Sequence, residues 1–302
     1  MKKHTSLCLT ALIMPAAYGT IIVDDSFADG DRSKTGALDS DWWTSSSSAG
    51  DEISVGALGL VTGSSGRGLH TTFPTQTLSN AGDSLVLTYT FNTPTTIGSS
   101  SSAAFRVGVF DTLGRALNAD ISASSGTPNP LYGWSVSNGG AGDAGLPGYL
   151  LDYDINTGAA ADINFRDHNT DSATGRLLST TGGSSFSSFS SGPDAGYTFA
   201  SNTSYTGSIT LTRDEVGGID LTGTIGGSSY TVNDSAPDSY DFGMLGFHVN
   251  SNRFGSSNTA GNPDNGLDFT NVSVEFTQGV PEPSSLGLLL LGGLLTFKRR
   301  RA

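Results

Sequence analysis

Short runs of alternating hydrophobic and polar residues follow one another along most of the chain, separated by clusters of Gly, Ser, Asn and Asp. Such runs predict β-strands, because successive side chains of a strand point to opposite faces. No interior stretch repeats its hydrophobic residues at the 3.6-residue period of a helix. The pattern therefore predicts an all-β body, with its clearest strands at residues 85–91, 104–110, 148–153 and 162–166.

Three further runs predict a meander of antiparallel strands at residues 207–213, 219–225 and 228–232. Gly226-Gly227 supplies the positive φ angles that a tight hairpin needs. In the middle run Ile and Leu fall on one face while Asp and Thr fall on the other, which is typical of a sheet with one buried face. The last run, 267–276, changes its alternation near Thr270-Asn271, which predicts a β-bulge. Strands at this spacing fit a single two-sheet antiparallel jelly-roll sandwich over residues 20–279.

Residues 1–19 have the features of a secretory signal peptide. Lys2 and Lys3 form a basic start, residues 7–14 an apolar core, and Ala17-Tyr18-Gly19 a small-x-small cleavage site. The sequence thus predicts export through the Sec machinery. The single cysteine, Cys8, lies inside this segment, so the exported chain is expected to have no disulfide and no thiolate ligand.

Residues 280–302 combine three parts in order. Pro281, Glu282 and Pro283 precede an uncharged apolar run at 286–297, and the segment closes with a basic tail of Lys298, Arg299, Arg300 and Arg301. As a short hydrophobic helix the run would reach about 18 Å, against a hydrocarbon core of about 30 Å, which predicts a marginal membrane span. The basic tail is expected to stop transfer and stay cytoplasmic, which leaves the body outside.

This three-part segment resembles the PEP-CTERM sorting signal of exported bacterial proteins. The resemblance implies transient anchoring in the inner membrane, followed by recognition and removal of the tail by an exosortase-type enzyme. It also implies a final location at the cell surface or in the extracellular space, and an association with exopolysaccharide.

The body is similar to the concanavalin/laminin-G-like sandwiches common among PEP-CTERM proteins. The similarity is carried by "DDSFADGD", "GDSLVLTYTF", the meander "SITLTRDEVGGIDLTGTIGGSSYTV", "LGFHV" and "LDFTNVSVEF". It implies a lectin-like jelly roll whose first and last strands lie side by side, where a structural ion often ties the termini together.

The charge of the body excludes one class of partner. Residues 20–283 contain nine Lys and Arg against 28 Asp and Glu, a net charge of −19. Nucleic-acid binding needs phosphate neutralisation by Lys and Arg, so no nucleic-acid partner is expected. Solubility and the binding of divalent cations fit this charge better.

No catalytic residues are predicted. The four glutamates form no E-x-D-x-x-E strand, and the G-x-S-x-G and H-E-x-x-H motifs are absent. A carboxylate pair assembled from distant loops stays open. His248, within "LGFHV", is interpreted as a sheet residue, and His168 as part of a solvated loop with a ligand role as the alternative.

Structural calcium is the one candidate cofactor, because oxygen ligands on acidic loops suit this ion. The lectin-like resemblance implies that Asp25 and Asp268 share a site, with Asp29 as third candidate. The alternative is a solvated acidic turn. A second set, Asp152-x-Asp154-x-Asn156, has its glycine one residue late for an EF-hand and lacks the closing Glu.

Trp43 and Trp134 are the candidates for stacking on sugar rings, with core packing as the alternative. Adjacent Trp42 and Trp43 should point to opposite sides of an extended segment, which leaves one of them accessible.

Three functions stay open at the level of sequence. The favoured prediction is a non-enzymatic surface or matrix protein with a structural or adhesive role. The alternatives are a carbohydrate-binding module, with or without calcium dependence, and a polysaccharide hydrolase or lyase. The fold class hosts all three.

Overall fold

The computed structural model describes residues 18–44, 51–61, 66–98, 105–114, 146–155, 163–168, 178, 186–189, 197–250, 253–257, 259 and 261–279. Residues 1–17 of the predicted signal peptide, the whole predicted sorting segment 280–302 and Trp134 lie outside this part of the chain.

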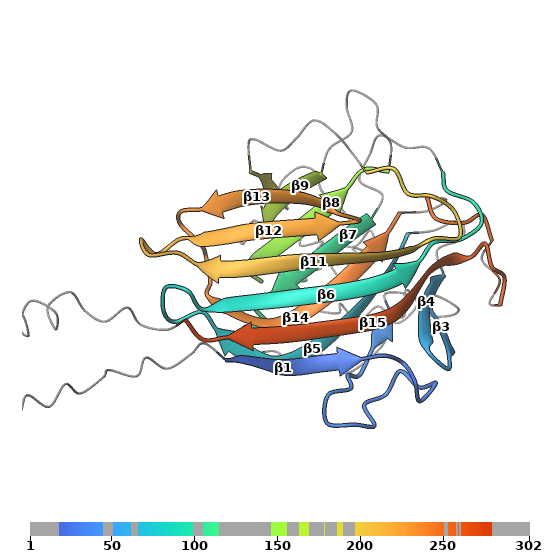
Figure 1. Cartoon of the computed structure of the whole chain (residues 1–302), viewed down its shortest axis with the longest axis horizontal. Coiled ribbons are helices and arrows are strands. Elements are labelled where there is room, and N and C mark those ends of the chain that lie inside the picture. The colour runs from blue at the N-terminus through green and yellow to red at the C-terminus, as the bar shows by residue number, and fades with distance from the viewer. Residues whose placement is uncertain are drawn as a thin grey trace, which may run out of the picture.

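The described residues contain no helix and form two antiparallel sheets that lie one in front of the other (Figure 1). The front sheet has eight strands: β13 (Ser228–Asp234), β12 (Ile219–Ile225), β11 (Ser204–Arg213), β6 (Ser84–Asn92), β15 (Gly266–Thr277), β4 (Ala57–Val61) and β3 (Asp51–Ser54) in spatial order, with β1 (Gly19–Asp25) also paired to β15. The second sheet has seven, in the order β10 (Phe186–Ser188), β9 (Ile163–His168), β8 (Gly148–Tyr153), β7 (Phe105–Phe110), β14 (Asp241–Val249), β5 (Arg67–Thr77) and β2 (Trp43–Thr44). The predicted two-sheet sandwich is confirmed.

Several local predictions are confirmed as well. β8 and β12 have their predicted bounds. Gly226 and Gly227 form the turn between β12 and β13 with φ angles of 51° and 88°. The register of β15 against β6 shifts between Phe269 and Asn271, which is the predicted bulge. β1 pairs with β15, so the first and last strands lie side by side.

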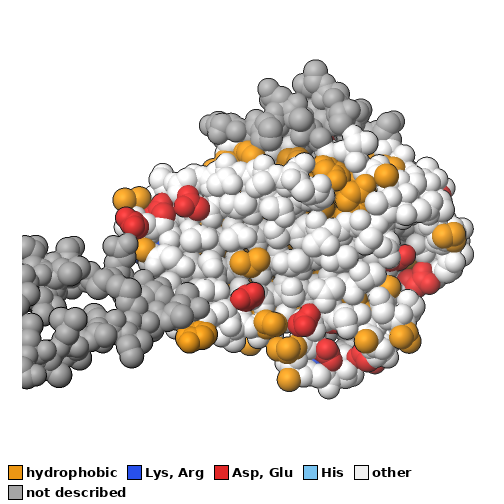
Figure 2. Space-filling model, viewed as in Figure 1, with side chains coloured by type: hydrophobic (Ala, Val, Ile, Leu, Met, Phe, Trp, Pro, Cys, Tyr) orange, Lys and Arg blue, Asp and Glu red, His pale blue; other side chains and the backbone are white. Residues whose placement is uncertain are grey.

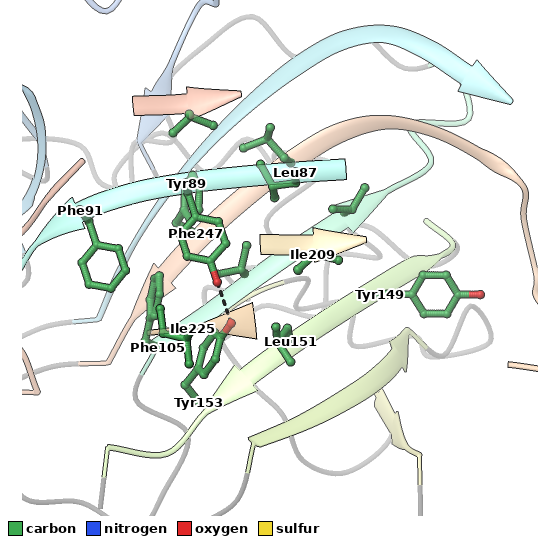
Figure 3. Packing of buried hydrophobic residues seen from close by; sticks show 14 of the residues in the cluster. Leu87, Tyr89, Phe91, Phe105, Tyr149, Leu151, Tyr153, Ile209, Ile225 and Phe247 are labelled. Atoms are coloured by element: carbon green, nitrogen blue, oxygen red, sulfur yellow. Dashed lines mark hydrogen bonds between the residues drawn. The ribbon is translucent and has the colours of Figure 1, made fainter. Parts of the chain in front are cut away.

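Alternate side chains of both sheets fill the space between them (Figure 3). Tyr89 of β6 and Tyr153 of β8 meet across this core, with their hydroxyl oxygens 2.7 Å apart. Burial raises the pKa of both hydroxyls, so both stay protonated. The ring of Phe105 stacks on Tyr153 at 5.6 Å between centroids. Each such buried side chain contributes about 1.5–3 kcal/mol to folding, and the hydroxyl pair satisfies two buried polar groups across the sheet interface.

The start of β1 and the end of β15 lie side by side (Figure 1). Gly19 pairs with Thr277 in this ladder. Beyond the strand, the Gly279 amide donates to the buried carboxylate of Asp83 at 2.7 Å. Hydrogen bonds therefore hold the described chain to the body up to residue 279, directly before the predicted sorting segment.

The outer face of the eight-stranded sheet carries mainly serine and threonine. Figure 2 shows this face largely free of charged and hydrophobic side chains, apart from scattered patches. Hydroxyl pairs of 2.7–3.0 Å join neighbouring strands there, between Thr90 and Thr206, Ser208 and Thr224, and Thr222 and Thr231. This face is polar, and the charged side chains visible on it are acidic (Figure 2).

Candidate functional site

The outer face of the seven-stranded sheet carries charged and imidazole side chains. In β7 the residues Phe105, Val107 and Val109 belong to the core, so Arg106 projects from the opposite face. The register places Arg106 opposite Asp152 of β8 on one side and opposite His248 of β14 on the other. We call Arg106, Asp152, Arg166 and His248 the polar row.

Arg106 holds the centre of the polar row and is only 4% exposed. Its Nη1 donates to the carbonyl oxygen of Leu178 at 2.9 Å, to Nδ1 of His248 at 3.3 Å and to Oδ1 of Asn250 at 3.4 Å. Its Nε lies 3.7 Å from Oδ1 of Asp152. Burial lowers the pKa of Arg106, and the charge of Asp152 opposes this effect. An arginine keeps its proton in proteins, so the group is a buried cation.

Asp152 lies between two guanidinium groups. Arg166 of β9 donates through Nε to Oδ2 of Asp152 at 3.1 Å, and through Nη1 to the Ser188 hydroxyl at 2.6 Å. Asp152 is 1% exposed, and a carboxylate at such depth requires paired positive charge. The pairing with both arginines removes Asp152 from the second predicted calcium set.

His248 is the neutral member of the polar row. Burial, and after it the charge of Arg106, hold the pKa of His248 well below its usual value. Among the described residues its Nε2 has no hydrogen-bond partner. The row thus combines two cations, one anion and a neutral imidazole on the face that points away from the core.

Beside the polar row the same sheet face is hydrophobic. Phe110, Leu150 and Met244 project there and form a second buried cluster with Leu146, Leu178 and Phe186. Leu178 lies over the facing residues Gly108 and Gly246, where added Cβ atoms would come within 3.0 Å and 2.5 Å of its side chain. The two glycines therefore make room for Leu178. The carbonyl oxygen of Leu178 accepts a hydrogen bond from Arg106.

Trp42 and Trp43 point to opposite sides, as predicted. Trp42 is buried against Phe247 in the core. Trp43, in the edge strand β2, is half-buried with its ring centroid 5.6 Å from that of His70. Trp43 therefore stands at the edge of the outer face that carries the polar row, whereas Trp134 lies outside the described residues.

Asp25 has a structural role that its sequence context did not reveal. Its carboxylate accepts from the Phe27 amide at 2.9 Å, the Ser40 amide at 3.3 Å and Nε1 of Trp42 at 2.8 Å. These donors hold the loop between β1 and β2 against the core. The carboxylate is buried and already engaged.

The predicted calcium trio is not brought together. Asp268 lies four residues from Val272, the β15 residue opposite Asp25, which is roughly 12 Å along the strand. Asp29 lies in an exposed turn and accepts from the Asp31 amide and the Thr35 hydroxyl. In the part of the chain that the structure describes, no group of three or more Asp, Glu, His or Cys side chains is suited to a metal ion.

The interpretation of His168 as a solvated loop residue is wrong. His168 ends β9 and is fully buried, with Nδ1 2.7 Å from the carbonyl oxygen of Leu146. His248 is confirmed as a sheet residue. The polar row itself was missed, although Arg106 and Asp152 stand as lone charges inside the hydrophobic runs "AFRVGVF" and "GYLLDY". A lone charged residue inside a hydrophobic strand indicates that its side chain is paired with another polar group in the fold.

Comparison with known proteins gives no family. No protein-family model and no curated protein matches the chain. Solved structures with a similar fold include the Emp47p carbohydrate recognition domain, at 15% identity and a TM-score of 0.44, covering 86% of this chain and 95% of that one. Peanut lectin has 9% identity and a TM-score of 0.45, covering 88% and 100%. The alginate lyase Aly36B has 11% identity and a TM-score of 0.40, covering 89% and 98%. At these values the likeness carries no argument about function.

Within the described residues, no helix has the length and hydrophobicity needed to cross a membrane. The predicted membrane segment, its motif Pro281-Glu282-Pro283 and its basic tail lie outside those residues.

Proposed function

We propose that the protein is an exported, non-enzymatic carbohydrate-binding protein of the cell surface or extracellular matrix, and that the glycan binds at the Trp43 edge of the outer face of its seven-stranded sheet. One observation carries the proposal: Trp43 of the edge strand β2 is only half-buried, whereas Arg106, Asp152 and His248 on the same face are almost fully buried. Ligand sites are lined mainly by aromatic and hydrophobic side chains, with a few polar groups beside them.

Trp43 adds an apolar surface at the edge of this face. Its half-buried indole lies in an edge strand, beside the imidazole of His70. Indole faces pair with the apolar faces of pyranose rings, and a tryptophan half-exposed beside polar groups is suited to this contact. Trp43 would contribute the contact area for the sugar.

The state of His248 supports binding over catalysis. A guanidinium only donates hydrogen bonds, so Nδ1 of His248 accepts from Arg106 and the single proton of the neutral ring sits on Nε2. Nδ1 is then engaged by Arg106 and Nε2 carries the proton, so the ring has no free lone pair with which to remove a proton from a substrate.

Export and C-terminal sorting form the second half of the proposal. The predicted signal peptide, PEP motif, apolar run and basic tail support it. The paired strands β1 and β15 bring the two predicted processing regions to the same end of the body. Removal of both segments would leave the body free to meet exopolysaccharide.

Binding to a polysaccharide panel tests the proposal. The protein recovered from its own host is incubated with the panel, which includes the host exopolysaccharide, and released sugars are assayed in the same tubes. We expect saturable retention without released sugars. Replacing Trp43 with Ala should weaken retention, while Val55→Ala, which removes an exposed hydrophobic side chain elsewhere, should not. Release of sugar would establish an enzyme instead, and equal loss in both variants would place the site elsewhere.

A further inference from the structure

The chain is held to the body directly before the predicted sorting motif. The amide of Gly279, two residues beyond the end of β15, donates to Oδ1 of Asp83 at 2.7 Å. Asp83 is 1% exposed, and its Oδ2 accepts from the Asn80 amide at 2.8 Å. Charge-assisted hydrogen bonds of this kind are among the stronger ones, so the contact resists local opening of the chain. We call the contact between Gly279 and the turn of residues 80–83 the C-terminal latch.

The C-terminal latch also encloses the α-carbon of Gly279. A Cβ added there would lie 2.4 Å from the carbonyl oxygen of Ala81, 2.6 Å from the carbonyl carbon of Gly82 and 2.8 Å from the amide nitrogen of Asp83. All three are backbone atoms, and the turn is itself held, since the Gly82 amide donates to the carbonyl oxygen of Arg213 at 2.8 Å. The turn therefore closes around residue 279 only when that residue is a glycine.

An enzyme that cuts a polypeptide needs the chain on both sides of the cut bond to be free of the fold. Bonds inside a folded body are cut only after local opening. The strand β15 is paired up to Thr277, and the C-terminal latch extends the protected chain to Gly279. Val280 is the first residue beyond the latch, and the motif Pro281-Glu282-Pro283 follows at once. The first unprotected bonds therefore lie at the predicted motif.

From these observations we propose that the processing enzyme cuts at a bond on the C-terminal side of Gly279, and that the mature body keeps Gly279 in the latch. The inference rests on the proposed export and sorting, and it specifies where the processing site lies. In this step one peptide bond breaks and its acyl group passes to water or to an amine acceptor. The nitrogen of the released tail takes the proton that the acceptor loses.

The distance to the predicted membrane segment limits the site from the other side. Leu286, the first residue of the apolar run, follows Gly279 by seven residues. A fully extended chain of that length reaches at most about 25 Å. The processing enzyme would therefore act within about 25 Å of the C-terminal latch, between the body and the membrane.

Mapping the C-terminus of the protein recovered from its own host tests the inference. Intact mass and terminal peptides identify the last residue of the chain. We expect this residue to be Gly279 or a later one, with the basic tail removed. A mature chain that has lost Gly279 would overturn the inference and leave sorting standing. A chain that keeps Arg299, Arg300 and Arg301 would overturn sorting, and the inference with it.

A general protease tests the C-terminal latch itself. The full chain, produced without the host's processing enzyme and kept in detergent, is treated with proteinase K, and mass spectrometry gives the point at which trimming stops. We expect trimming of the wild type to stop beyond Gly279. In Gly279→Ala the added methyl group meets the backbone of the turn, so trimming should reach closer to Thr277 and remove residue 279 at least about tenfold faster.

Gln278→Ala is the matched control, because it changes the exposed neighbouring residue and should leave the trimming limit unchanged. All three chains keep the same prolines beyond the latch, so a difference between them reports the latch and not the preference of the protease. Thermal melts check that each variant is folded. The same trimming limit in folded Gly279→Ala and in the wild type would overturn the inference.

Discussion

At the scale of single residues, the role of a side chain depends on the partners that the fold brings to it. Asp25 reads in the sequence as one acid among four in "DDSFADGD". In the fold its carboxylate accepts three N–H groups and fixes the loop that carries Trp42. Hydrogen bonds to a buried carboxylate do not appear in sequence patterns, because the donors come from up to 17 residues away.

Replacing Asp25 with Ala should destabilise the protein by about 3 kcal/mol, because the buried donors lose their acceptor. Urea unfolding measures this change. Asp29→Ala, in the exposed turn four residues on, serves as the control and should change stability by less than about 0.5 kcal/mol. Equal effects of the two substitutions would contradict the assigned role of Asp25.

Asp167 makes stability depend on pH. Burial, and after it the charges of Asp234 and Asp238, raise its pKa to about 7. The folded protein therefore holds a proton that the unfolded chain has lost, and stability falls as pH rises from about 4 to about 7. Asp167→Asn should abolish this pH-dependent loss of stability. It should raise the free energy of unfolding by about 2 kcal/mol at pH 8 and change it little near pH 4. Unfolding of both proteins across this range checks the expectation; a gain that is constant with pH would refute it.

At the level of strands, hydrophobic alternation in the sequence predicted several strand bounds and local features correctly. The bounds of β8 and β12, the Gly226-Gly227 hairpin and the bulge in β15 all follow from side-chain period and turn chemistry. Strand order does not follow, because β6 pairs with β11 and β15 across long stretches of sequence. Alternation also marks the two faces of β7 without saying which face carries a site, and so the polar row stayed hidden.

The hairpin between β12 and β13 depends on its second glycine. Gly227 has a φ angle of 88°, and an added Cβ would meet no atom within 4 Å, so only the backbone conformation opposes a side chain. Gly227→Ala should therefore cost about 1 kcal/mol, measured by urea unfolding. Ser228→Ala, at the next exposed position, should be nearly neutral. A neutral Gly227→Ala would mean that the turn relaxes to another type.

At the scale of the whole molecule, the paired ends of β1 and β15 predict tolerance to circular permutation. Gly19 lies opposite Thr277, so a short linker can join the two ends without crossing the body. New ends placed at the exposed turn of Glu215 and Val216, between β11 and β12, would interrupt no strand. We expect the permuted body to keep its β-type circular dichroism and a cooperative melt. New ends placed inside β6, which is bonded on both sides, should abolish folding and provide the control.

The position of β15 also has a mechanical consequence. This strand leads directly to the C-terminal segment, and it is bonded to β6 on one side and to β1 and β4 on the other. A tether attached beyond Thr277 and pulled along the strand would load these ladders in shear, so that many hydrogen bonds resist together. A pull that separates Gly19 from Thr277 would instead open β1 from β15 one bond at a time. The sandwich should therefore be strong when held by its C-terminal end alone, and weak when pulled apart by both ends.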